Sequence, residues 1–92
     1  MKFMTTWVLR EGHVQTAAQR FLAGDATPPE GIELLGRWHA ADLSCGWSLA
    51  EASDAQPLLA LAVKWAEELE MSIVPVVEDQ AAGQELAKKY GG

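Results

Sequence analysis

The stretch IELLGRWHAADLSCGWSLAEA, residues 32–52, decides the fold of this chain. Residues 32–41 and 45–52 are each rich in apolar and aromatic side chains, which predicts two strands. The short polar segment between them, residues 42–44, predicts a three-residue turn. We therefore expect a β-hairpin at the centre of the sequence, with the remaining elements arranged around it.

The residues before the hairpin predict a strand, a helix and a loop. Residues 2–9 are aromatic and β-branched, and they predict a strand that is apolar on both faces. Between residues 13 and 23 the apolar side chains recur at helical spacing, which predicts an amphipathic helix. Residues 24–31 contain two prolines and glycine at both ends, which is typical of a loop.

The residues after the hairpin predict a helix, a strand and a final helix. Ser53 followed by Gln56 has the pattern of a capping box, so a helix is expected to begin there. It carries an apolar stripe from Leu58 to Leu69, while Glu67, Glu68 and Glu70 are interpreted as a solvated helix face or end. Residues 71–78 predict a strand in which Pro75 marks an edge position or a bulge. Asp79 is expected to cap a short helix whose inward side chains are Ala82, Leu86 and Tyr90.

The predicted order is β-α-β-β-α-β followed by a C-terminal helix. This order is typical of an α+β domain of the ferredoxin-like, split βαβ kind, with a four-stranded antiparallel sheet and both long helices on one face. The sequence shows no internal repeat and no linker, so residues 1–92 are expected to form a single domain.

The composition suggests that one copy does not bury all of its apolar surface. A chain of 92 residues has a marginal core. Yet 49% of its residues are apolar, with four tryptophans, and several fall on both faces of predicted strands. Helices cover only one face of such a sheet, so we expect a partner surface, most simply in a homodimer.

Charge and motif content exclude several classes of function. The net charge of −6 argues against binding to nucleic acid or to an anionic membrane surface. The single cysteine forms no internal disulfide, and no signal peptide or membrane-spanning run is found, so a cytoplasmic protein is expected. No metal-site spacing and no glycine-rich phosphate loop occurs, so we expect neither a metal nor another cofactor.

One polar cluster in the hairpin is the candidate site. With a three-residue turn, residues that face each other across the two strands sum to 86, which places Arg37, His39, Trp47 and Glu51 together on the face away from the helices. A two-residue turn would change this pairing, because a shift of one residue turns one strand's side chains to the other face.

These four side chains suit a small organic ligand. His39 is a candidate acid or base near neutral pH, Arg37 is suited to hold a carboxylate or enolate oxygen, and Glu51 is placed to orient the imidazole. Trp47 would form an apolar wall. The competing interpretation is structural, with Arg37 and Glu51 forming an ion pair at a dimer interface and His39 hydrogen-bonded beside them.

Several segments of the sequence resemble a known family. They are residues 1–7, residues 28–39 with the run PPEGIELLGRWH, Gly46 and Trp47 leading to Glu51, and the block at residues 74–76. Over nearly the whole chain these resemble a bacterial family of short proteins, the domain of unknown function DUF3303. The resemblance implies the dimeric α/β-barrel superfamily, in which two ferredoxin-like sheets pack together, and it implies no single function.

Three functions remain open at this point. The first is a small cofactor-free enzyme, of isomerase or monooxygenase type, that uses His39. The second is a homodimer that binds a small organic molecule without catalysis, and the third is a purely structural or partner-binding dimer.

Overall fold

A computed structural model gives the architecture of the chain and describes residues 1–91. The elements are β1 (Lys2–Leu9), α1 (Val14–Leu22), β2 (Glu33–His39), β3 (Cys45–Glu51), α2 (Gln56–Trp65), β4 (Leu69–Val76) and α3 (Asp79–Tyr90). This is the predicted β-α-β-β-α-β order with an additional C-terminal helix. The ferredoxin-like α+β fold is therefore confirmed.

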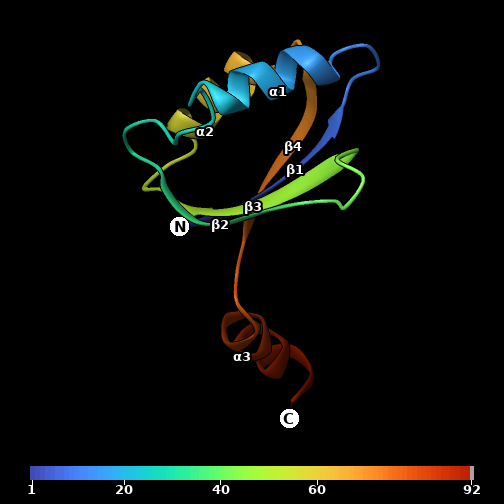
Figure 1. Cartoon of the computed structure of the whole chain (residues 1–92). Coiled ribbons are helices and arrows are strands. Elements are labelled where there is room, and N and C mark those ends of the chain that lie inside the picture. The colour runs from blue at the N-terminus through green and yellow to red at the C-terminus, as the bar shows by residue number, and fades with distance from the viewer. Residues whose placement is uncertain (92) are drawn as a thin grey trace.

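The four strands form one antiparallel sheet in the order β2-β3-β1-β4. Helices α1 and α2 both cover the same face, as predicted (Figure 1). Pro75 lies on β4, an edge strand, where its missing N–H costs no bond to a further strand. The face turned away from α1 and α2, called the bare face here, carries Met4, Thr6 and Val8 of β1 with their neighbours on the other strands.

The predicted register of the hairpin is wrong. In the structure Arg37 pairs with Ser48 and His39 pairs with Gly46, so facing residues sum to 85. The Ala40 N–H donates to the Cys45 carbonyl at 2.9 Å, which leaves four residues in the loop in place of three. A bulge between Leu34 and Gly36 shifts the register once more. The change of one residue turns the odd-numbered side chains near the end of β2 toward the helices.

Two further boundaries differ from the prediction. Helix α2 begins at Gln56, whose N–H donates to the Asp54 carboxylate at 2.8 Å, so Asp54 satisfies the helix start and not Ser53. Strand β4 begins at Leu69, two residues earlier than expected. Leu69 therefore belongs to β4, and the apolar stripe of α2 ends at Trp65.

The core of the domain is small. Phe3, Ala52 and Leu58 form its buried centre, and Ile32 and Ile73 pack against it. Phe3, Thr5 and Trp7 occupy every second position of β1 and therefore share the helix-covered face. Towards Trp7 this core gives way to a cavity, so the helices and the sheet are closely packed at one end only.

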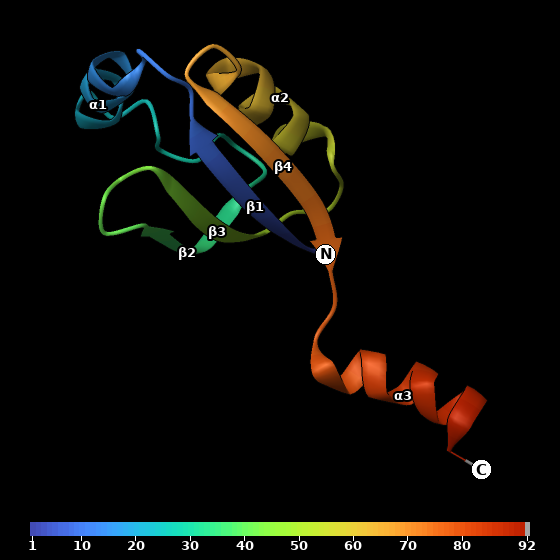
Figure 2. The same cartoon turned by 90° about the vertical axis from the view of Figure 1, so that its right-hand side faces the viewer.

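Helix α3 does not fold back onto the domain. It follows β4 as a separate arm on the opposite side of the sheet from α1 and α2 (Figures 1 and 2). Leu86 and Tyr90 are 57% and 73% exposed, so the expectation that they pack inward is wrong. The radius of gyration is 15.7 Å, against about 12 Å for a compact chain of this length, because of the arm.

Candidate functional site

A cavity of about 440 Å³ lies between the sheet and the two covering helices. Strands β1, β2, β3 and β4 form its floor. Ala17 and Phe21 of α1 and Leu58, Leu61 and Trp65 of α2 contribute to its roof. The volume falls within the range of about 300–1,000 Å³ found for small-molecule sites, and the walls are mostly apolar.

One row of polar side chains crosses the floor of this cavity. Thr5 on β1 pairs with Ser48 on β3, and Ser48 pairs with Arg37 on β2. All three line the cavity, and Thr5 and Ser48 are buried. Neighbouring strands are about 4.8 Å apart, so two hydroxyls and a guanidinium follow one another across roughly 10 Å. The row offers hydrogen-bond donors and acceptors within an otherwise apolar space.

Arg37 is half-buried at the end of this row. Its Nη1 donates to the Ala26 carbonyl at 2.8 Å, and its guanidinium carbon lies 5.4 Å from the centre of the Phe21 ring. The first contact fixes the loop that follows α1, and the second brings the side chain under α1. A guanidinium has five N–H donors, and the contact with Ala26 uses one of them, so the group retains capacity for a carboxylate or another oxygen ligand.

His39 lies in the next row of the floor, between two aromatic rings. Its ring makes edge contacts with Trp7 at 5.8 Å and with Phe21 at 5.5 Å between centroids. Gly46 faces His39 across the strand pair, and a Cβ at Gly46 would come within 2.2 Å of the Trp7 ring. The glycine therefore lets the indole cross β3 and reach the imidazole. Among the described lining residues, His39 is the one that carries an imidazole, a group suited to act as a general acid or base.

The structure separates the four residues predicted to form the site. Arg37 and His39 lie in the cavity on the helix-covered face, whereas Trp47 and Glu51 lie on the bare face. Glu51 accepts a hydrogen bond from the amino group of Met1 at 2.6 Å, and Trp47 pairs with Trp38. The predicted cluster, its position away from the helices and the ion pair between Arg37 and Glu51 are therefore wrong. The physical reason is the four-residue loop, which reverses the facing of β2 against β3.

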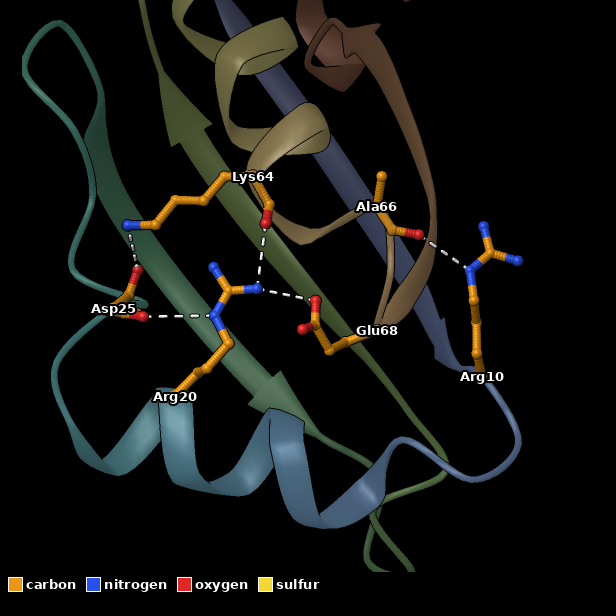
Figure 3. A network of polar contacts seen from close by, with 6 residues as sticks. All are labelled: Arg10, Arg20, Asp25, Lys64, Ala66 and Glu68. Atoms are coloured by element: carbon orange, nitrogen blue, oxygen red, sulfur yellow. Dashed lines mark hydrogen bonds and ion pairs between the residues drawn. The ribbon is translucent and has the colours of Figure 1, made fainter.

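A polar network fixes α1 above the cavity (Figure 3). Arg20 of α1 donates to the Glu68 carboxylate at 2.8 Å, to the Asp25 carboxylate at 3.3 Å and to the Lys64 carbonyl at 3.1 Å. Lys64 Nζ in turn donates to the Asp25 carbonyl at 2.9 Å. The guanidinium of Arg20 also stacks over Trp65 at 4.2 Å. These contacts connect α1 to α2 and to the segment before β4.

Charge pairing dominates the environment of Arg20. Partial desolvation disfavours its charged form, but the hydrogen bonds to Glu68 and Asp25 outweigh this and raise the pKa of Arg20 above its ordinary value. Glu68 is only 4% exposed, so its interpretation as part of a solvated helix end is wrong. A buried carboxylate is retained here because a guanidinium neutralises it.

Sequence reasoning missed Thr5, Ser48 and the Arg20–Glu68 pair. Ser48 lies between Trp47 and Leu49 in β3 and Thr5 lies in an apolar strand, so only a correct register would have shown that they are neighbours. Arg20 and Glu68 are 48 positions apart, and no local pattern joins them. Among residues 1–91, no group of three or more His, Cys, Asp or Glu side chains is placed to hold a metal ion. In the same part of the chain, every helix is too short or too polar to cross a bilayer.

Comparison with known proteins gives one result. No curated protein and no solved structure produced a significant match to the chain. The family model described as "Domain of unknown function (DUF3303)" matches residues 1–90. Because this match covers nearly every residue, the chain belongs to the DUF3303 family.

Proposed function

We propose that this protein binds a small, largely apolar organic molecule that carries an acidic or oxygen-rich group. The observation that carries the proposal is the polar row of Thr5, Ser48 and Arg37 on the floor of a 440 Å³ apolar cavity. The two hydroxyls and the guanidinium line the cavity, and a ligand oxygen placed over the row could accept hydrogen bonds from them. The apolar body of the ligand would lie against the rings of Trp7, Phe21 and Trp65.

The acidic group is assigned to Arg37 because guanidinium binds carboxylates with two parallel hydrogen bonds. A suitable probe pair is 2-naphthoic acid and its neutral analogue 2-naphthamide, which share an aromatic body. We expect Arg37→Met to weaken binding of the acid about tenfold or more and to change binding of the amide about twofold or less. Equal weakening of both probes would mean that Arg37 only supports the loop at Ala26, and it would contradict the assignment.

The location of the site is tested by filling the cavity from α1. Ala18 lines the cavity, whereas Thr16 is exposed on the same helix and does not line it. Titration by tryptophan fluorescence should show that Ala18→Phe loses affinity for both naphthyl probes, while the matched control Thr16→Phe binds as the wild type does. Unchanged binding to Ala18→Phe would place the bound probe elsewhere.

We also propose that the protein is a homodimer formed through the bare face. Trp38 and Trp47 are 57% and 42% exposed there, Val8 and Val74 are exposed on the same face, and Leu35 is exposed at the bulge of β2. An apolar patch of this kind on a small domain is typical of an interface. In sedimentation equilibrium at micromolar concentration the wild type should be a dimer, and Thr6→Glu on the central strand should be a monomer. A monomeric wild type would refute the dimer.

Catalysis is the alternative function, and the position of His39 favours it. The imidazole lines the cavity beside the polar row, within reach of a bound ligand. Native mass spectrometry of the purified protein would identify a co-purifying molecule, which is then incubated with wild type and with His39→Gln. Chemical conversion by the wild type alone would establish an enzyme, whereas binding without conversion in either protein supports the non-catalytic function.

A further inference from the structure

Helix α3 extends away from its own domain with an apolar stripe of which Leu86 and Tyr90 are exposed and Ala82 is half-buried. The stripe consists of Ala82, Leu86 and Tyr90, which recur at four-residue spacing and so share one side of the helix. The side of α3 nearest to its own domain carries Gln80, Ala81 and Gln84, which border a shallow hollow with the start of β1 and the end of β4. The helix therefore turns polar and small residues inward and its apolar stripe outward.

A helix of this length is not stable on its own account. Twelve residues are marginal for an isolated helix in water, and Gly83 in its second turn weakens it further. One ion pair anchors the segment before it, between Lys2 and Glu78, and both groups face solvent. Burial of the apolar stripe against another surface would supply the stability that the helix lacks.

We propose that α3 is an exchanged arm that docks on the bare face of a second copy of this chain. The inference rests on the proposed homodimer and adds to it the element that holds the two copies together. The arm already lies on the bare-face side of the sheet, where a second copy would pack (Figures 1 and 2). A second copy satisfies both unpartnered surfaces at once, since each copy supplies one arm and one bare face.

The topology specifies which part of the partner the arm would meet. The arm follows β4 at one edge of the sheet, and β2 forms the other edge. When two sheets face each other about a two-fold axis parallel to their strands, β4 of one copy lies over β2 of the other. Val76 at the end of β4 is level with Lys2, Glu51 and Glu33 of its own sheet. The arm would therefore begin beside the first residues of the partner's β2, and a turn at residues 77–78 would bring it back along the partner's bare face towards the exposed indoles.

The exposed apolar area of the bare face and the arm together approaches that of a standard dimer interface. The two half-exposed indoles each have roughly 100 Å² of surface accessible to solvent. Leu35, Val8 and Val74 together add about as much as the two indoles do. The exposed side chains of the arm add roughly 300 Å² or more. Together these approach the ~800 Å² per partner of a standard interface. The exposed apolar side chains of the bare face alone fall well short of that area.

The first test is the dimer dissociation constant of arm variants, measured by sedimentation. Leu86→Asp introduces a charge into the stripe, and Gln84→Asp introduces the same charge on the opposite side of the helix. We expect Leu86→Asp to raise the dissociation constant at least tenfold and Gln84→Asp to change it less than threefold. Equal effects of the two variants, or no effect of Leu86→Asp, would contradict the docking of the apolar stripe on a second copy.

The second test locates the arm on the partner. A nitroxide is attached at Ala87→Cys in a Cys45→Ser background, and this protein is mixed with wild type carrying ¹⁵N-tryptophan. Paramagnetic broadening of indole signals then reports contact between copies only. The signals of Trp38 and Trp47 should broaden, and those of Trp7 and Trp65, on the cavity side, should remain sharper. A dimer without this difference refutes the docking of α3 on the partner but not the dimer itself, whereas a monomeric wild type refutes both.

Discussion

Replacing Arg20 by methionine tests how the polar network holds α1 above the cavity. The substitution keeps an unbranched apolar side chain and removes the donors to Glu68, to Asp25 and to the Lys64 carbonyl. Glu68, at 4% exposure, would be left in a nearly dry site without its cationic partner. The stacking of the guanidinium over Trp65 would also be lost.

The expected loss of unfolding free energy is about 3 kcal/mol. Removing one partner of a fully buried ion pair costs about 3–5 kcal/mol. The side chain of Arg20 is 23% exposed, so water can partly replace it and the cost falls to about 2–3 kcal/mol. The cation–π contact with Trp65 adds about 0.5–1 kcal/mol. A chain of this length has about 5–14 kcal/mol in total, so the variant stays folded but is strongly weakened.

Urea unfolding followed by tryptophan fluorescence measures this loss, at one fixed protein concentration because a dimer gains apparent stability with concentration. The matched control is Arg10→Met, since Arg10 donates to the Ala66 carbonyl at 3.0 Å on the exposed surface (Figure 3). It should lose less than about 1 kcal/mol. The unfolding free energy lost by the double variant Arg20→Met, Glu68→Met should be smaller than the sum of the losses in the two single variants, by about 1 kcal/mol or more. Equal losses in Arg20→Met and Arg10→Met, or an additive cycle, would refute the reasoning.

Three further outcomes are expected from the same structure. Leu58→Ala should lose about 2–5 kcal/mol of unfolding free energy because Leu58 is 1% exposed, and Leu59→Ala on the exposed side of α2 should lose less than about 0.5 kcal/mol in the same urea assay. Gly46→Ala should lose about 1–3 kcal/mol and alter tryptophan fluorescence, since the new methyl would overlap the indole that crosses it; a neutral result would contradict the packing. The hydrogen bond from Lys2, and then its charge, lower the pKa of Glu78, so this pair contributes above the ordinary carboxyl value of 4.5 and is lost as the pH falls through the lowered pKa. In an NMR titration Lys2→Met should return the Glu78 midpoint towards 4.5, and an unchanged midpoint would exclude the pair.

The element order could be predicted from the sequence because each element has its own local pattern. Period-two and period-3.6 spacing, the Pro-rich loop and Pro75 on β4 are read within windows of about ten residues. These windows assign the ferredoxin-like order, with errors of one or two residues at Gln56 and Leu69. Local sequence thus specifies which element forms and roughly where it begins.

The candidate site could not be predicted to the same degree, because it depends on loop length. A loop of three residues and one of four residues both fit the segment around Asp42, and they place Arg37 on opposite faces of the sheet. Leu43 adopts a left-handed conformation with φ of 64°, which few apolar residues favour, so its residue type gave no indication of the turn. Arg37 and His39 can be assigned to one face from the sequence, because they are two positions apart on one strand. That Glu51 lies on the opposite face follows only from the register between β2 and β3.

The apolar residues of this chain fall into three places, and only one of them is satisfied within a single copy. The core around Phe3 and Leu58 is buried, a second group lines the cavity between the helices and the sheet, and the third is exposed on the bare face and the arm. Arg20 maintains this arrangement, because its polar contacts fix α1 where close packing would otherwise fill the cavity. A small core of this kind gives modest stability on its own. Ligand binding and dimerisation should therefore both raise the unfolding free energy, and a probe at 100 times its dissociation constant should add about 2.7 kcal/mol. The stabilisation by the ligand should persist in a monomeric Thr6→Glu variant if the cavity belongs to one copy, and it should vanish there if the second copy completes the site.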